Sequence, residues 1–391
     1  MRKIWPFSFY FLYFAGIAAF APYLVLFYQS KGLSGTQIGL LTGITPLVTL
    51  VSVPFWTGLA DSTGRHRLIM SVAMLAAVAT LLVFPLIDTF VLIFGLAILT
   101  NTFFSPVTAF ADSATMFMLG TRKDLYGRVR LGGTLGFGLT ATIIGILVEN
   151  SGLKMAFWSA AAFFFLGFLV SLKMTHGSTA SKATLTRDRI QALLKNPHWL
   201  IFMILAFTGG MAFSVSNSYF FPFMKELGAS ESTMGLALTL GTVAEIPVML
   251  FVNRMIIRFK SYGLLILALV FTGLRMLLFA VAFTPAFALF AQLFNGFTFP
   301  IMWVAGVSYA DEHAPEGMRT TAQGMFSAVV SGIGSAAGGF LGGLLLASIG
   351  GRGLYLVFGL VVFIILALVT ISRKRLPPEI IRPATELGVS E

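Results

Sequence analysis

The chain has 391 residues, of which 57% are hydrophobic and only 10% are charged, and its mean hydropathy is +0.90. Soluble proteins carry about 25% charged residues, so this composition excludes an ordinary soluble domain and indicates a protein embedded in a bilayer. The absence of cysteine excludes disulfides, thiolate nucleophiles and cysteine-ligated metal sites. A net charge of +11 is compatible with nucleic-acid binding, but the positions of the basic residues explain it differently.

Twelve apolar runs are long enough to cross about 30 Å of hydrocarbon, so we predict an all-α membrane protein with twelve transmembrane helices. The runs lie near residues 5–29, 37–60, 68–87, 89–119, 131–149, 154–172, 198–223, 233–253, 262–282, 286–310, 320–348 and 353–372. The first run begins as a signal peptide does, but Pro22 directly follows the small residues that a cleavage site would need. We therefore expect this run to be a retained helix.

A polar segment divides the spans into two sets of six. We expect a six-helix bundle over 1–172, a cytoplasmic linker over 173–197, a second six-helix bundle over 198–372 and a cytoplasmic tail over 373–391. Within the linker, RDRIQALLK is expected to form a short amphipathic helix at the membrane surface.

The distribution of lysine and arginine predicts the orientation, because cytoplasmic loops carry the excess of basic residues. If the termini and the linker share one side, that side holds most of the 26 basic residues. The opposite loops then hold only Lys31, Lys154, Lys225 and Arg352. We therefore expect a multi-pass protein of the cytoplasmic membrane with both termini in the cytoplasm, and no nucleic-acid partner.

The two halves have matching tyrosine, glycine, proline and asparagine residues at an offset of about 195 residues, which is typical of an internal duplication. Matching pairs are Tyr23 with Tyr219, Gly39 with Gly235, Pro54 with Pro247, Asn101 with Asn295 and Pro106 with Pro300. Six-helix copies share one membrane orientation, so a substrate cavity is expected between them near the bilayer midplane. In this alignment Ser52 corresponds to Glu245 and an apolar residue to Arg275, so the intramembrane charges belong to the second half alone.

The segment GLADSTGRHRL, residues 58–68, resembles the signature loop between helices 2 and 3 of the major facilitator superfamily. Its phenylpropionate-permease branch, close to the oligosaccharide and nucleoside proton symporters, is similar in five blocks: YGRVRLGGTLGF (126–137), AEIPVM (244–249), LRMLLFA (274–280), AQLFNGFTF (291–299) and AQGMFSAVVSGIGSAAGGFLGG (322–343).

This resemblance implies the major facilitator fold of two pseudo-symmetric six-helix bundles, and proton-coupled transport by alternating access. Two residues depart from the branch: Gly132 stands where a tryptophan is usual, and Asn295 where a histidine is usual. The second departure removes a titratable group from helix 10, which affects substrate identity and the details of proton coupling.

Glu245 lies in the middle of the apolar run VAEIPVML, and Arg275 is similarly deep in the next span. Charges inside a membrane are costly and are usually paired, so we expect these two side chains to meet. One interpretation is proton coupling, in which ionised Glu245 holds Arg275 and protonated Glu245 releases it, so that the halves can rock. The alternative is a static buried ion pair that fixes helix register.

Residues with amide or phenol groups inside the spans are candidates for substrate binding, and packing between helices is the alternative for each. They are Gln292, Asn295, Asn101, Asn217, Tyr10 and Tyr13. Charged residues near the cytoplasmic helix ends are candidates for gate latches, with solvated interfacial charges as the alternative. They are Asp61, Arg65, Arg67, Asp112, Arg128 and Arg130. Asp112 is expected to pair with Arg128, Arg130 or Arg65.

These patterns predict a monomeric secondary transporter that uses protons to import a small organic solute, namely an aromatic acid, a sugar or a nucleoside. The alternatives are an exporter or lipid flippase of the same fold, or a membrane receptor that does not transport. No nucleophile with a base and acid is visible, so no enzyme is expected. The glycine run of helix 11 lacks the Lys-Ser/Thr of a phosphate loop, and no cofactor or metal is expected.

Overall fold

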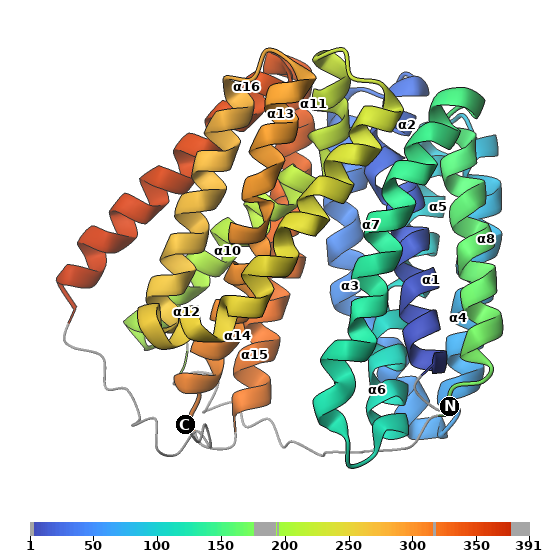
Figure 1. Cartoon of the computed structure of the whole chain (residues 1–391), viewed down its shortest axis with the longest axis horizontal. Coiled ribbons are helices and arrows are strands. Elements are labelled where there is room, and N and C mark those ends of the chain that lie inside the picture. The colour runs from blue at the N-terminus through green and yellow to red at the C-terminus, as the bar shows by residue number, and fades with distance from the viewer. Residues whose placement is uncertain (1–3, 176–192, 194, 316–317, 377–391) are drawn as a thin grey trace.

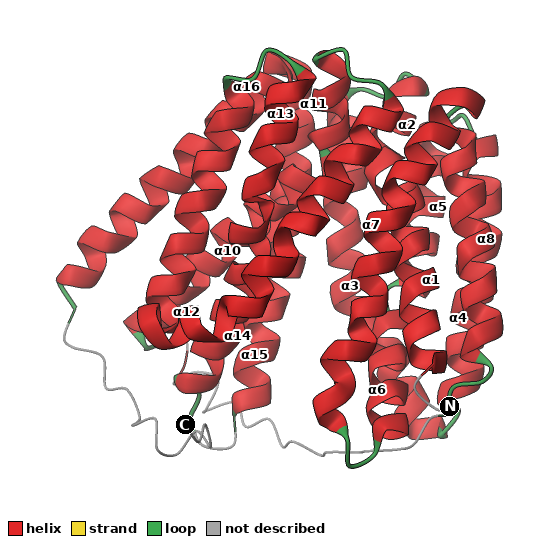
Figure 2. Ribbon diagram, viewed as in Figure 1, coloured by secondary structure: helices red, strands yellow, loops and turns green. Residues whose placement is uncertain are grey.

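The computed structural model describes residues 4–175, 193, 195–315 and 318–376, and these residues form helices and loops without a β-strand (Figures 1 and 2). The first half contains α1 (Ile4–Phe20), α2 (Leu24–Ser30), α3 (Gly35–Thr63), α4 (His66–Val83), α5 (Phe90–Phe104), α6 (Val107–Leu119), α7 (Tyr126–Ser151) and α8 (Lys154–Ser171). The second half contains α10 (Pro197–Ser218), α11 (Phe220–Glu226), α12 (Glu231–Ala280), α13 (Pro285–Gln292), α14 (Phe299–Glu312), α15 (Arg319–Ser327) and α16 (Ser335–Lys374).

The twelve predicted spans are confirmed, although several are broken or joined. The first span is α1 and α2 with a 3₁₀ turn between them at Ala21–Tyr23, where Pro22 stands. Spans 8 and 9 run on as α12, whose backbone leaves the helical conformation at Lys260 (φ 57°). Spans 11 and 12 run on through α16, where Gly350 has a φ of 70°. Eleven segments of the described chain meet the length and hydropathy of a span, because the last two are continuous.

The helices form two bundles, one from α1 to α8 and the other from α10 to α16, and both described chain ends lie at the same end of the molecule (Figure 1). The expected amphipathic helix in the linker lies almost entirely outside the described residues. The exact domain boundaries at residues 172 and 198 remain predictions.

Across the interface, α3 packs against α16 and α7 packs against α12. Glycines allow these pairs to approach, and the duplicated pair Gly39 and Gly235 serves the same purpose in each half. A Cβ at Gly39 would lie 2.6 Å from the carbonyl oxygen of Phe340, and a Cβ at Gly235 would lie 2.3 Å from that of Ala141. Both distances are too short for any side chain, so the repeat places glycine where the backbones of the two halves touch.

Hydrogen bonds between described residues of the two halves lie toward the end away from the termini. Near the start of α3, Thr42 and Tyr219 both donate to the carbonyl oxygen of Gly339, at 2.8 Å for Thr42. On the other side of the interface, the hydroxyls of Thr142 and Thr239 are 2.8 Å apart. The halves are therefore sealed against each other at the end opposite the termini; we call this the sealed end.

Candidate substrate and proton site

A cavity of about 480 Å³ lies between the two halves. The first half contributes residues of α1 and α7, and the second contributes α10, α12, α13 and α14 with the 3₁₀ turn η4 (Leu293–Phe297). Its volume is within the range of about 300–1,000 Å³ that is typical of small-molecule sites. Three of its lining residues are charged, namely Arg130, Glu245 and Arg275.

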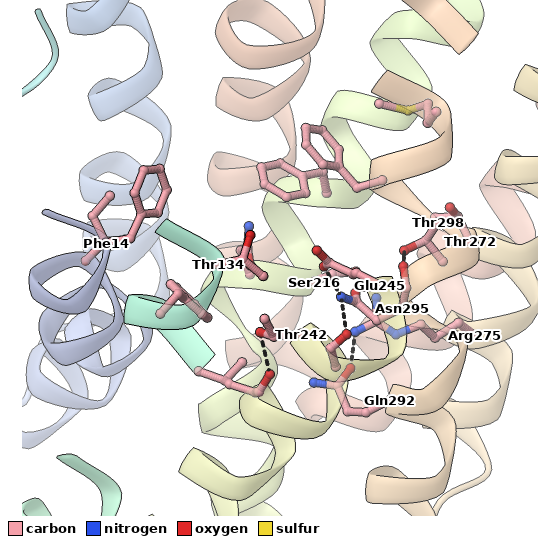
Figure 3. Close-up of a pocket in the computed structure, with 18 of the residues that line it drawn as sticks. Phe14, Thr134, Ser216, Thr242, Glu245, Thr272, Arg275, Gln292, Asn295 and Thr298 are labelled. Atoms are coloured by element: carbon pink, nitrogen blue, oxygen red, sulfur yellow. Dashed lines mark hydrogen bonds between the residues drawn. The ribbon is translucent and has the colours of Figure 1, made fainter. Parts of the chain in front are cut away.

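The polar centre of this cavity is formed by Glu245 and Arg275 with two amides between them (Figure 3). Asn295 donates from Nδ2 to Oε1 of Glu245 at 2.6 Å, and Arg275 donates from Nη2 to Oε1 of Gln292. No ion pair within 4.0 Å joins Glu245 directly to Arg275 among the described contacts. The direct contact expected from the sequence is thus replaced by amide hydrogen bonds. The tenth span, formed by α13, η4 and α14, places Gln292 and Asn295 beside the two charges.

Arg275 is held in a strongly desolvated environment. Only 6% of the residue is exposed, and its Nε has no hydrogen-bond partner in the described chain. Burial of a guanidinium is tolerated only with a compensating charge or polar groups nearby. Glu245, facing the same cavity, is the acidic residue that can supply this compensation.

Asn295 lies in a local break of the tenth span, between α13 and α14. The helix narrows to the 3₁₀ turn η4 directly after Gln292, and the α-helix resumes only at Phe299. The sequence predicted one continuous helical face for these two amides. The structure instead directs Gln292 to Arg275 and Asn295 to Glu245, so the break separates the partners of the two residues.

The first half has an equivalent of this contact. Asn101 precedes the break between α5 and α6, and its Nδ2 donates to the carbonyl oxygen of Thr45 at 2.6 Å and to Oγ1 of Thr49 at 2.9 Å. These partners are four residues apart on α3, and Asn101 does not line the main cavity. Asn101 therefore joins two helices inside the first half in this conformation.

The second half repeats this arrangement with one chemical change. Asn295 contacts α12 through the carbonyl oxygen of Gly241 at 3.4 Å and through Glu245, again four residues further on. By this pattern of contacts, Glu245 occupies the place of Thr49, and not of Ser52 as the sequence alignment indicated. The second half therefore has a carboxylate at the contact for which the first half uses a hydroxyl.

Arg130 reaches the cavity from α7. Its guanidinium lies 4.7 Å from the ring centroid of Tyr10 and 4.3 Å from that of Phe14. Asp112 does not bind the arginines expected from the sequence; it accepts hydrogen bonds from the hydroxyls of Tyr10 and Tyr126, the latter at 3.0 Å. Arg130 therefore borders the cavity while stacked on aromatic rings, and a phenol separates it from Asp112.

The other candidates for substrate contact divide into two groups. Asn217 and Gln292 line the cavity, and the side chain of Asn217 makes no hydrogen bond to another described residue. Tyr10 and Tyr13 do not line it, because both are buried against neighbouring helices. Tyr13 stacks on Phe104 with ring centroids 5.2 Å apart.

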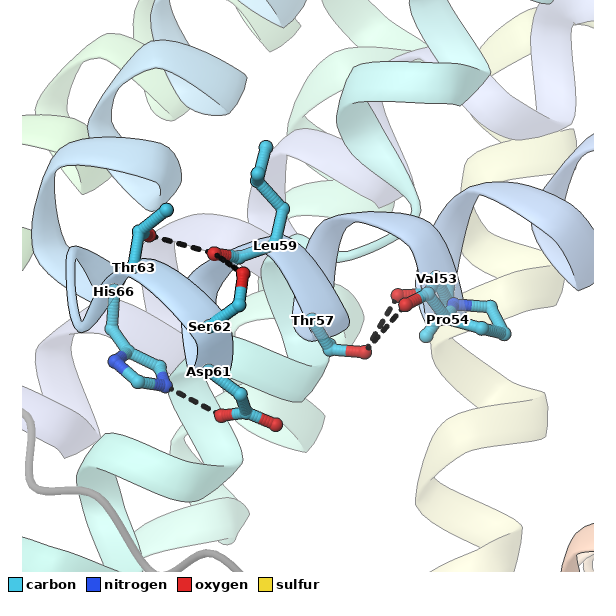
Figure 4. Close-up of polar contacts among 8 residues, drawn as sticks. All are labelled: Val53, Pro54, Thr57, Leu59, Asp61, Ser62, Thr63 and His66. Atoms are coloured by element: carbon cyan, nitrogen blue, oxygen red, sulfur yellow. Dashed lines mark hydrogen bonds and ion pairs between the residues drawn. The ribbon is translucent and has the colours of Figure 1, made fainter.

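The contacts that the loop candidates make with described residues lie within the first half. Asp61 lies 2.8 Å from Nε2 of His66 (Figure 4), and Arg67 donates to the carbonyl oxygen of Leu172 at 2.6 Å. Arg65 borders the same surface depression as Arg67, and Arg128 is exposed and lines neither cavity of the interface. In this conformation the loop is therefore tied to the end of α8, and not to the second half.

Several cavity residues were not predicted from the sequence. Thr134 and Phe137 lie on the same face of α7 as Arg130, at helical spacings of four and seven residues. Phe213 and Ser216 form a similar stripe on α10. The signal was present as polar and aromatic residues at these spacings, but periodicity alone does not say which face of a helix turns toward the interface.

Comparison with known proteins agrees with this geometry. The model of the MFS_1 like family matches residues 4–357. The chain belongs to this family of major facilitator transporters. It is therefore a multi-pass membrane transporter and not an enzyme.

Its relatives include sugar and nucleoside permeases. The maltose permease of Geobacillus stearothermophilus is 26% identical over 377 residues, which cover 96% of this chain and 95% of the permease. The xanthosine permease of Escherichia coli (strain K12) is 21% identical over 366 residues, covering 88% and 86%. The crystal structure of the nucleoside transporter NupG superposes with a TM-score of 0.85 at 17% identity, covering 96% of this chain and 100% of that one. The predicted fold of two six-helix bundles is thus confirmed.

Proposed function

We propose that this protein is a proton-coupled symporter that imports a small polar ring-containing solute, with Glu245 as the group that binds and releases the proton. The observation that carries the proposal is the position of Glu245. It is the acidic residue lining a cavity between the two halves, where Asn295 binds it and Arg275 shares its surroundings.

The proposed cycle uses the asymmetry between the two ends of the interface. With both termini in the cytoplasm, the sealed end faces outward, so this conformation is the inward-facing one. The latch residues Asp61, Arg65 and Arg67 are proposed to close the inner end when the cavity opens to the outside. Asp112 and Arg128 lie at the same end and are proposed to contribute there.

Proton binding changes the charge of the cavity and thereby the balance between conformations. Ionised Glu245 compensates buried Arg275, whereas neutral Glu245 leaves Arg130 and Arg275 as two uncompensated cations. A bound solute whose oxygen atoms accept hydrogen bonds from these guanidinium groups can stabilise the two cations in place of the carboxylate. Occupied and protonated protein is then able to reorient, while protein that carries the proton alone is not.

The lining favours a solute with ring faces and hydroxyl or carbonyl groups. Phe14, Phe137, Phe213 and Phe299 provide apolar surfaces, and the polar residues provide both donors and acceptors. Sugars, nucleosides and aromatic acids all have this combination of faces and polar edges. The resemblance to a maltose permease and to a xanthosine permease is consistent with the first two classes.

Purified protein in liposomes with an imposed pH gradient tests the proposal. We expect one class of a panel of sugars, nucleosides and aromatic acids to accumulate, with substrate-dependent alkalinisation on the side from which it is taken. Solute movement against the direction of the proton flow would indicate an exporter and contradict the proposal. Transbilayer movement of a fluorescent phospholipid, with no movement of any panel member, would indicate a flippase instead.

A further inference from the structure

A second cavity, of about 450 Å³, lies next to the main cavity on its sealed side. Residues of α1, α2 and α3 line it from the first half, and residues of α10 and the π-helical turn η5 (Ala328–Gly334) line it from the second. It shares Ile17, Phe137, Phe213 and Asn217 with the main cavity. The two spaces are therefore adjacent, with side chains of two phenylalanines on their common border.

The chemistry of the second cavity differs from that of the main one. No charged residue of the described chain lines it, whereas three charged residues line the main cavity. Its polar groups are hydroxyls, among them those of Thr45, Thr49, Ser218 and Ser331, and the amide of Asn217 at the border. The rest of the lining is mostly aliphatic or aromatic. Such a lining suits a neutral ring that carries hydroxyl groups.

Several of these polar groups have hydrogen-bonding capacity that the protein does not use. The side chains of Ser218, Ser331 and Asn217 form no hydrogen bond with any described residue. Asn217 and Ser331 are exposed and Ser218 is half-buried, so all three can bind a ligand that enters the cavity. Ser331 is presented by η5, and π-helical turns of this kind occur frequently at functional sites.

We propose that the second cavity is a sugar subsite, and that the substrate is a neutral disaccharide with one ring in each cavity. This inference rests on the proposed function and names its substrate class. One ring lies in the main cavity, within reach of Arg130 and the polar centre. The second ring lies beyond the border, with its faces toward Phe137 and Phe213 and its hydroxyls toward the serines and threonines.

This binding mode gives the second ring a part in the transport cycle. Thr45 belongs to α3, and Ser331 belongs to η5, so the ring contacts both halves near the sealed end. A solute that bridges these walls favours the conformation in which the sealed end is closed. A single-ring solute fills only the main cavity and lacks this contribution.

Variants that fill the second cavity are expected to weaken uptake of two-ring solutes and to spare uptake of one-ring solutes. Ser331→Phe and Ser218→Phe each place a bulky ring into it from a different helix, and Ile333→Phe is the matched control. Ile333 lies two residues from Ser331 in the same turn, is 53% exposed and lines neither cavity. The measurement is the KM for proton-driven uptake of maltose, sucrose and lactose, and of glucose and galactose, in liposomes.

We expect the wild type to take up at least one of the disaccharides, and both filling variants to raise its KM at least tenfold. Uptake of the monosaccharides, where the wild type shows it, stays within twofold, and Ile333→Phe behaves as wild type. Because a large ring can disturb folding, the variant Ser218→Ala, Ser331→Ala serves as a second test. It removes only hydroxyls and is expected to raise the disaccharide KM about threefold, with monosaccharide uptake unchanged.

Three results overturn the inference. Equal losses for one-ring and two-ring sugars would show that the second cavity acts on the conformational cycle and not on a second ring. Proton-driven uptake restricted to nucleosides, aromatic acids or monosaccharides would exclude the disaccharide while leaving the proposed symport intact. Failure of every panel member to move with protons would overturn the proposed function and this inference together.

Discussion

The side-chain amide of Asn295 donates to the carboxylate of Glu245 at 2.6 Å, where the first half has Asn101 donating to the hydroxyl of Thr49 at 2.9 Å. The duplicated fold thus makes one amide contact between helix pairs in each half, and only the second copy carries a charge. The first half makes this contact with a hydroxyl, so the contact itself does not require the carboxylate of Glu245.

Replacing Glu245 by the residue of the first half is therefore expected to preserve the fold. In Glu245→Thr the hydroxyl can still accept from Asn295, whereas Glu245→Leu leaves the amide without this acceptor. An unsatisfied buried polar group costs about 1–3 kcal/mol. Both variants lose the charge that compensates buried Arg275, so thermal unfolding in detergent is expected to give Glu245→Leu a lower Tm than Glu245→Thr. The reverse order would contradict the proposed equivalence with Thr49.

Arg130 is expected to contribute to solute affinity and not to folding. Arg130→Ala removes the guanidinium that borders the cavity over Tyr10 and Phe14, and we expect the KM to rise about tenfold, equivalent to about 1.4 kcal/mol. Arg122→Ala is the control, because Arg122 is exposed in the loop before α7, lines neither cavity and has no proposed part in the gate. Similar KM values for the two variants would exclude Arg130 from the site.

The glycines of the interface are expected to control which end is sealed. Gly235→Leu drives a side chain into the backbone of Ala141, so the sealed end cannot close and the outward-open state is favoured. The chain has no cysteine, so a single Asn217→Cys background can report access to the cavity. An impermeant maleimide added outside right-side-out vesicles is expected to label this cysteine faster in Gly235→Leu.

Gly95→Leu is the control for this labelling experiment. A Cβ at Gly95 would meet no heavy atom within 4 Å, so its labelling rate is expected to equal that of the parent. Unchanged labelling in Gly235→Leu, in a protein that still unfolds cooperatively, would show that the α7–α12 contact does not form the outer seal.

Asp88 is expected to have no part in the pH dependence of transport. It lies in the loop before α5, where a hydrogen bond from Lys31 and the positive charge of Lys31 lower the pKa of Asp88 below its usual 3.8. A carboxyl with a lowered pKa stabilises the folded state above its unfolded pKa, and this contribution is lost as the pH falls through the lower folded value. The contact is thus constant between about pH 5 and 8. Asp88→Asn is expected to leave the shape of the pH profile of uptake unchanged, and a shifted profile would contradict this.

The fold could largely be predicted from the sequence, because hydrocarbon thickness sets the length of each span and the internal repeat sets the number of halves. Pro22 and Pro106 coincide with breaks in the first and fourth spans. Pro46, Pro54 and Pro247 lie inside the continuous helices α3 and α12, so a proline alone does not predict where a span breaks. The 3₁₀ turn at Asn295 was not predicted, although Pro300, the counterpart of Pro106 in the repeat, follows it at the start of α14.

The candidate site could be predicted less well. Apolar surroundings alone marked Glu245 and Arg275 as exceptional, and both line the cavity. By contrast, the direct pairing of the two charges and the inward orientation of Tyr10 and Tyr13 depend on how each helix is rotated about its axis. In helices that are apolar on every face, hydrophobic periodicity does not indicate that rotation.

Proton-driven accumulation by Glu245→Gln tests the central claim most directly. Glutamine keeps an acceptor for Asn295 but cannot release a proton, so the variant in liposomes is expected to exchange labelled for unlabelled solute at a rate near that of wild type. It is also expected to show no accumulation when a pH gradient is imposed. Accumulation equal to that of wild type under the same gradient would contradict the assignment of Glu245 as the proton-binding group.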